Sequence, residues 1–179
     1  MVIFLLDKSG SMEERLEDTI GGFNCFIRNL HENSPEALVS LYTFSDRCTC
    51  EYSKVPVGEV KFMSRDSYVP AGNTALLDSI GKVIKDTGKE AEGLLVILTD
   101  GYENASRKYS KNHIKDLISL HPKLEVKYIG ADLEQASDLG INDTVRYDGA
   151  NTPGMFRMIS ESVGSVYAQR RESQSPATV

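Results

Sequence analysis

Two short hydrophobic runs along the chain each end at an aspartate. The first is VIFLL (2–6), followed by Asp7, and the second is GLLVILT (93–99), followed by Asp100. Uninterrupted apolar runs of this length are typical of strands that are covered on both faces in a parallel sheet. Ligand-binding groups collect where such strands end. If the two strands are neighbours, both acids lie at one edge of the sheet.

Apolar residues elsewhere follow the spacing of amphipathic helices or of further strands. Gly88 is suited to a helix C-cap, Ser110 to an N-cap, and Thr152-Pro153 to a helix start. The periodicity predicts helices over residues 16–30, 73–88, 110–121, 132–139 and 152–167. Further strands are expected over 37–44, 47–55, 124–131 and, more weakly, 143–148.

This alternation of strands and helices predicts one α/β domain. The expected fold is a doubly wound, three-layer α/β/α sandwich with a mostly parallel sheet. The segment 47–55 follows its neighbour after a short turn, so it is expected as an antiparallel edge strand. The domain should span residues 1–170, with a frayed tail at 171–179.

Composition and charge narrow the class of partner. Hydrophobic residues make up 40% of the chain and charged residues 26%, which is ordinary for a globular protein. The formal net charge of −6 disfavours binding to nucleic acid or to anionic membrane lipid. The opening apolar run is too short for a secretory signal or a spanning helix, so a cytoplasmic location is expected. The three cysteines do not form a disulfide pattern and are expected as reduced, small core residues.

Five oxygen-bearing side chains are candidates for a metal site. Two carboxylates and three hydroxyls stand at or just after predicted strand ends or at a helix start: Asp7, Ser9, Ser11, Thr74 and Asp100. Such hard oxygen donors, without thiolate or imidazole, favour Mg²⁺ or Mn²⁺ over zinc. Because three of the donors are neutral, a bound ion would retain positive character and accept one more anionic ligand.

The motifs DKSGS (7–11), AGNTALLD (71–78) and LLVILTDG (94–101) resemble the metal-ion-dependent adhesion site of the von Willebrand factor type A domain. The resemblance extends from Val2 to about Tyr167. It implies that the three hydroxyls ligate the metal and that the two aspartates contact it directly or through water. It also implies that an Asp or Glu of a partner protein completes the shell and that the 152–167 helix can shift and change affinity. The expected function is therefore metal-dependent protein binding.

Simpler and competing interpretations remain open. Ser11 and Glu14 form a capping-box pattern, and the other candidates are common in turns and caps, so a scaffold without metal is one alternative. A metal-dependent phosphoester hydrolase is another. An aspartyl phosphatase needs a second aspartate where Ser9 stands, and the nucleophile elbow and phosphate-loop patterns are absent, so no enzyme is predicted.

The sequence supports weaker predictions about the roles of other polar residues. The three histidines, His31, His113 and His121, lie near predicted helix ends and are expected to be solvated or capping. Lys8, Glu103 and Arg107 could rim the metal and select a partner.

Overall fold

A computed structural model describes residues 1–146 of the chain. The helix expected over 152–167, the end of the last strand at 147–148, the domain boundary at 170 and the tail at 171–179 lie outside the described residues.

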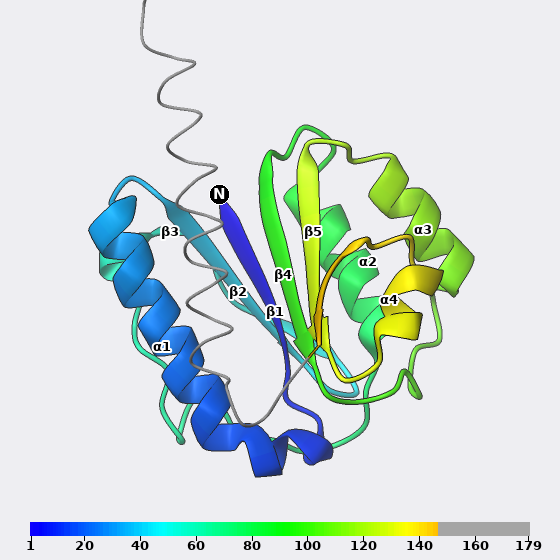
Figure 1. Cartoon of the computed structure of the whole chain (residues 1–179), viewed down its shortest axis with the longest axis horizontal. Helices are drawn as coiled ribbons and strands as arrows, with labels where there is room; N and C mark the ends of the chain where they lie inside the picture. The colour runs from blue at the N-terminus through cyan, green and yellow to red at the C-terminus, as the bar shows by residue number, and fades with distance from the viewer. Residues whose placement is uncertain (147–179) are drawn as a thin grey trace, which may run out of the picture.

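The centre of the fold is a six-stranded sheet with the order β3-β2-β1-β4-β5-β6 (Figure 1). Only β3 is antiparallel to its neighbour, and the other pairs are parallel. The strands are β1 (Val2–Asp7), β2 (Leu38–Phe44), β3 (Cys48–Pro56), β4 (Gly93–Thr99), β5 (Leu124–Gly130) and β6 (Asp143–Arg146). The predicted fold class, with its antiparallel edge strand, is confirmed.

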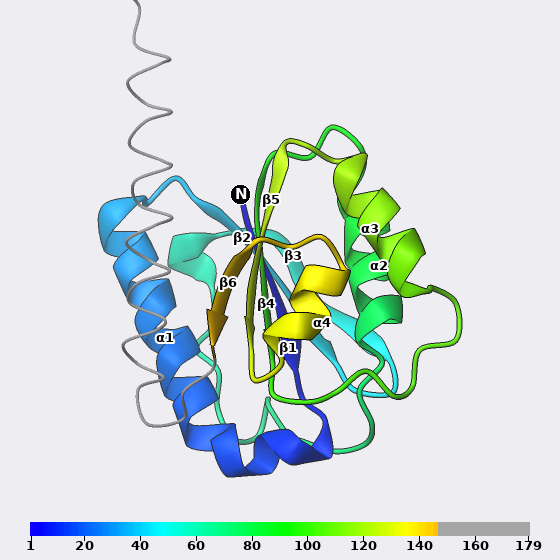
Figure 2. The same cartoon turned by 45° about the vertical axis from the view of Figure 1, so that its right-hand side comes forward.

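Helices cover both faces of this sheet (Figures 1 and 2). They are α1 (Leu16–Asn33), α2 (Leu76–Thr87), α3 (Lys111–Ser119) and α4 (Leu133–Asp138), with short 3₁₀ helices η1 (Gly10–Arg15) and η2 (Val57–Glu59). One core lies between α1 and the sheet, and the other contains residues of α2, α3 and α4.

The first hydrophobic run has no polar interruption because side chains of β1 contribute to both cores. All six residues of β1 are buried. Phe4 faces α1, where its ring packs edge-on against Phe23 and Phe26 at centroid distances of 5.2 and 4.8 Å. Ile3 and Leu5 belong to the core on the opposite face. Since successive side chains of a strand point to opposite faces, an alternating polar pattern would place polar groups in one of the cores.

The two strands that end in aspartates are neighbours. β1 pairs with β4 in parallel, with Leu6 opposite Leu98. The chain passes from β1 to β2 and β3 on one side of the sheet, then crosses to β4 on the other. Ligands of open α/β sheets bind at the carboxyl ends of strands beside such a reversal of strand order. Asp7 and Asp100 both lie at this position.

Two sequence-based expectations differ from the structure. The helix expected to begin at 73 begins at Leu76, with Ala75 as a non-helical N-cap (φ −91°, ψ 62°), so Thr74 precedes it. The cysteines are unpaired, as expected, but Cys50 is exposed and Cys25 and Cys48 are only half-buried. Cys48 packs against the core that contains α2, so the interpretation as a small core residue is wrong for exposed Cys50 but not for Cys48.

Within residues 1–146, no helix combines enough length with enough hydrophobicity to cross a bilayer.

Candidate functional site

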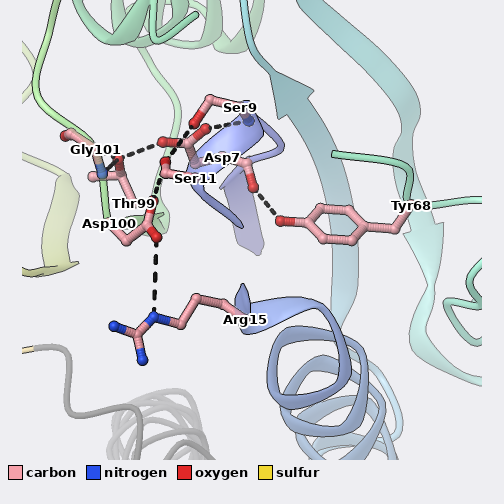
Figure 3. A network of polar contacts seen from close by, with 8 residues as sticks. All are labelled: Asp7, Ser9, Ser11, Arg15, Tyr68, Thr99, Asp100 and Gly101. Atoms are coloured by element: carbon pink, nitrogen blue, oxygen red, sulfur yellow. Dashed lines mark hydrogen bonds and ion pairs between the residues drawn. The ribbon is translucent and has the colours of Figure 1, made fainter. Parts of the chain in front are cut away.

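Asp7 lies at the centre of a polar network at the end of β1 (Figure 3). Its side chain is fully buried. Oδ1 accepts a hydrogen bond from the backbone N–H of Ser9 at 2.7 Å, and Oδ2 accepts one from the Thr99 hydroxyl at 2.5 Å. The Tyr68 hydroxyl donates to the Asp7 carbonyl oxygen. The carboxylate is therefore held from the turn and from β4, while the loop before Thr74 holds the Asp7 backbone.

Burial raises the pKa of Asp7 above its usual value. The hydrogen bonds from Thr99 and Ser9 act in the opposite direction because they stabilise the charged form, while the nearby carboxylate of Asp100 adds repulsion. Removal from water is the largest of these effects. A buried anion beside a second anion is an arrangement that a cation would stabilise.

The two serines connect the β1 turn to Asp100. The Ser11 hydroxyl donates to Asp100 Oδ1 at 2.6 Å, and the Ser9 and Ser11 hydroxyls lie 3.2 Å apart. The 3₁₀ helix η1 has no side-chain cap, so the structure does not contain the capping box expected as an alternative role for Ser11. Arg15 Nε lies 4.0 Å from the other oxygen of Asp100 and partly offsets its charge.

Gly101 has no side chain at a place that three of the candidate oxygens approach. A Cβ atom placed on Gly101 would lie 2.8 Å from Thr74 Oγ1, 3.5 Å from Ser11 Oγ and 3.6 Å from Asp7 Oδ2. Thr74 itself is only 3% exposed. With Ser9 and Asp100 bonded to Ser11, the structure brings all five predicted side chains to one place.

Backbone hydrogen bonds hold the segments that carry these side chains. The Thr74 N–H donates to Asn104 Oδ1 at 2.9 Å, and the Asn104 N–H donates to the Thr74 carbonyl at 3.1 Å. The β1 turn is joined to the loop before Thr74 by two further bonds, from Gly10 N–H to the Gly72 carbonyl (3.0 Å) and from Ala71 N–H to the Lys8 carbonyl (2.8 Å). The hydroxyl-bearing segments are therefore positioned relative to one another by main-chain contacts.

Glu103 has a structural role that differs from the expected one. Its carboxylate accepts hydrogen bonds from the N–H of Leu77 in the first turn of α2 and from the N–H groups of Ala105 and Ser106. The Ser106 hydroxyl also donates to it. Because these donors occupy both oxygens, the expectation that Glu103 rims the metal and selects a partner is wrong.

Asp78 also joins this loop to α2, but here the acceptor lies in the helix and the donors lie in the loop. Its carboxylate accepts hydrogen bonds from the N–H groups of Arg107, Lys108 and Tyr109 at 2.9, 2.9 and 3.0 Å, while its own N–H donates to Ser106 Oγ. Burial alone would raise the pKa of Asp78, but these three donors hold its pKa below the usual value. The loop after Asp100 and the helix after Thr74 thus form one hydrogen-bonded unit.

Sequence reasoning missed three residues that position the candidate ligands: Thr99, Tyr68 and Asn104. Thr99 carried a usable signal, since it is a polar residue at the buried end of an apolar strand and directly precedes Asp100. Tyr68 and Asn104 carried none, because their partners lie 61 and 30 residues away in the sequence.

The donor set is compatible with a hard divalent cation. Within residues 1–146, no group of three or more histidine, cysteine, aspartate or glutamate side chains could hold a metal ion. A metal at this edge would therefore depend on hydroxyl ligands as well as the two carboxylates. The three oxygens that gather beside Gly101, where no side chain intervenes, fit such an ion.

Comparisons with known proteins find similarity at the level of structure. No protein-family model matches the chain, and no curated protein matches it. Among solved structures, a von Willebrand factor type A protein from Catenulispora acidiphila has a TM-score of 0.61 at 15% identity and aligns with 89% of this chain. The chain has a von Willebrand factor type A-like fold.

Two further structures share this type A-like fold. Proximal thread matrix protein 1 from the mussel byssus, described with a zinc-occupied MIDAS motif, has a TM-score of 0.66 at 16% identity over 91% of this chain. The pilus adhesin SpaC from Lactobacillus rhamnosus GG has a TM-score of 0.71 at 13% identity over 92% of it. The chain covers 41%, 45% and 30% of the three proteins, which is less than half of each.

Proposed function

We propose that this chain is a protein-binding module whose binding depends on a divalent cation, Mg²⁺ or Mn²⁺. Its proposed ligands are Asp7, Ser9, Ser11, Thr74 and Asp100. The ligand from the partner is an aspartate or glutamate side chain.

The convergence of oxygens around Gly101 carries this proposal. Three oxygens from two separate segments, the β1 turn and the loop before α2, lie within 3.6 Å of the point where a Cβ would stand on Gly101. Side-chain oxygens of Ser9 and Asp100 are hydrogen-bonded to Ser11. A scaffold that used these residues only as turns and caps would not need to bring hydroxyls from two separate segments beside a buried carboxylate.

The chemistry of the donors supports a carboxylate as the partner's ligand. A bound divalent cation would supply a positive centre for an anionic oxygen, because only two of the five protein donors carry charge. Thr99 and the Ser9 N–H hold the Asp7 carboxylate in place, and Arg15 approaches the outer oxygen of Asp100. Solved structures with a similar fold include a pilus adhesin and a protein with a zinc-occupied MIDAS motif, which agrees with a binding role for a metal at this edge of the sheet.

A metal-dependent phosphoester hydrolase is the alternative function. Such an enzyme needs a general base close to the metal-bound water. Among residues 1–146, no side-chain hydrogen bond of the five candidate ligands goes to a histidine or lysine. We therefore propose binding as the function and not catalysis.

The experiment combines calorimetry with affinity capture. Titration of Mg²⁺ should show one site in the wild-type protein and none in Asp7→Ala or Asp100→Ala. Partners captured from the native host in Mg²⁺ should be lost on chelation and in Thr74→Ala. Thr49→Ala is the matched control, because Thr49 is exposed on the edge strand β3, which is separated from β1 by β2.

Two results would contradict the proposal. The metal site fails if both aspartate variants bind Mg²⁺ as the wild type does. The binding function fails if the same partners are captured in all conditions, or if the purified protein hydrolyses phosphoesters at a metal-dependent rate that Asp7→Ala removes.

A further inference from the structure

A groove adjoins the candidate metal site and continues along one side of α2. It consists of two neighbouring cavities of about 520 Å³ each that share Asp46, Arg47 and Asp78 in their walls. One cavity is lined by Asn73 and Asn104, which flank and hold Thr74. The other follows α2 through residues one turn apart, from Ala75 to Lys82 and Asp86. The groove therefore begins beside a proposed metal ligand.

Positive charge in this groove exceeds negative charge. Its walls contain five basic and three acidic side chains. Of the basic ones, Lys82 is paired with Asp86 at 2.5 Å. The other four are exposed and form no ion pair with any of residues 1–146: Arg47, Lys85, Arg107 and Lys108.

The acidic side chains of the groove are already engaged. Asp78 accepts three backbone hydrogen bonds from residues 107–109. Asp46 accepts hydrogen bonds from the N–H and the side-chain amide of Asn73 at 3.2 and 2.8 Å. These bonds direct the acidic groups toward the protein, while the four basic side chains, which define what we call the basic groove, are left for a ligand.

We infer that the basic groove binds further acidic residues of the same partner segment whose aspartate or glutamate is proposed to bind the metal. The chain as a whole has a net charge of −6, so a local excess of positive charge beside the metal ligands distinguishes this surface from the average surface. An extended peptide advances about 3.3 Å per residue, so the neighbours of the metal-binding acid reach the groove within a few residues. The partner is therefore an acidic peptide segment, and this inference rests on the proposed function.

Two fluorescein-labelled peptides of equal length test the inference by fluorescence anisotropy. Both carry one glutamate, flanked by aspartates in the first peptide and by asparagines in the second. In Mg²⁺ at low salt, the first should bind about tenfold more tightly, and the difference should shrink as ionic strength rises. The double variant Lys85→Glu/Lys108→Glu should abolish this preference while leaving Mg²⁺ affinity, measured by calorimetry, unchanged.

Lys89→Glu is the matched control. Lys89 is an exposed lysine just beyond the end of α2 and outside the groove, so the same change of charge there should preserve most of the preference. Circular dichroism melts of the three proteins establish that each is folded.

The outcomes separate this inference from the proposed function. If both peptides bind equally in Mg²⁺ and the double variant changes nothing, the groove inference is overturned and metal-dependent binding stands. If chelation or Thr74→Ala leaves binding of both peptides unchanged, the proposed function fails, whatever the groove contributes. Binding of a thymidine oligonucleotide more tightly than the aspartate-rich peptide would assign the groove to nucleic acid and overturn the inference.

Discussion

Gly101 keeps open the space toward which Asp7, Ser11 and Thr74 point their oxygens. Its contribution is the absence of a side chain, since its backbone is not among the positive-φ residues of the described chain. The aspartate before it supplies a carboxylate to the same space. A substitution that adds a single methyl group at position 101 should therefore disrupt the site without unfolding the protein.

Gly101→Ala should abolish Mg²⁺ binding, with a cost of about 1–3 kcal/mol in the free energy of unfolding. The new Cβ would lie 2.8 Å from Thr74 Oγ1, and β-branched threonine has little freedom to move away. Calorimetry and chemical denaturation measure the two effects. Gly21→Ala is the control, because nothing lies within 4 Å of its Cβ and alanine in a helix is favoured by about 0.5–1 kcal/mol. If Gly101→Ala retained wild-type Mg²⁺ affinity, the assignment of the space at Gly101 to the metal would be contradicted.

Asp7→Asn should stabilise the protein in chelator and remove its response to metal. The substitution eliminates a fully buried charge beside Asp100 but preserves shape, and the Thr99 hydroxyl can accept a hydrogen bond from the new amide. We expect the melting temperature of the variant to exceed that of the wild type by a few degrees in chelator and to be unaffected by Mg²⁺. A melting temperature clearly below the wild-type value in chelator would show that the carboxylate stabilises the metal-free fold.

The candidate ligands were predictable from sequence, whereas the residues that support them were not. Asp7 and Asp100 end apolar runs, and a strand end carries a functional side chain to a known edge of the sheet. The support of Thr74 by Asn104 depends on how two loops meet, and no periodic pattern encodes that contact. Glu103 was misjudged for the same reason, because its acceptor role requires the first turn of α2 to lie beside it.

At the scale of elements, α2 and the 103–109 loop each accept hydrogen bonds from backbone N–H groups of the other. Glu103 and Ser106 accept hydrogen bonds from N–H groups in the first turn of α2, and Asp78 accepts three from the loop. The first N–H groups of any helix need partners from outside it. This exchange fixes the segment after Asp100 against the segment after Thr74 and so sets the width of the site.

Asp78→Asn should reduce stability at neutral pH by about 1–2 kcal/mol, because one acceptor oxygen becomes an amide donor that faces a backbone N–H. The folded-state pKa of Asp78 lies below the unfolded value, so its contribution is complete above the unfolded pKa, near 3.9, and is lost as pH falls through the folded pKa. Denaturation curves of wild type and variant should therefore converge at acidic pH. Asp66→Asn, at an exposed loop position, is the control and should have little effect. A stability difference that persists unchanged at acidic pH would contradict this role.

Strands and helices were predictable as elements because β1 and β4 are covered on both faces, while β3 lies at the edge with mostly exposed residues. The start of α2 was less predictable. Thr74 resembles a cap in sequence, but the structure uses it before the helix and leaves Ala75 in the N-cap position. The hydrogen bonds to Asn104 and Glu103 determine this boundary, and both come from distant segments.

For the whole molecule, the two hydrophobic cores on either face of the sheet are built from apolar side chains and not from the candidate ligands. Metal should therefore add to stability without being required for folding. A ligand at about 100 times its dissociation constant contributes about 2.7 kcal/mol, which corresponds to a rise of roughly 5–10 °C in melting temperature for a domain of this size. Calorimetric melts in Mg²⁺ and in chelator measure this shift, and loss of helical circular dichroism at room temperature on chelation would contradict it.

The site is assembled from segments that lie far apart along the chain, at residues 7–11, 74 and 100–104, and hydrogen bonds with sequence separations of up to 92 residues hold it together. Domains fold as units when they emerge during synthesis. A ribosome that has released only the first half of this chain exposes the DKSGS turn without β4, without Asp100 and without the loop that holds Thr74. Under the proposed function, a chain that ends before β4 lacks part of the ligand set and does not compete for a partner with chains that contain it.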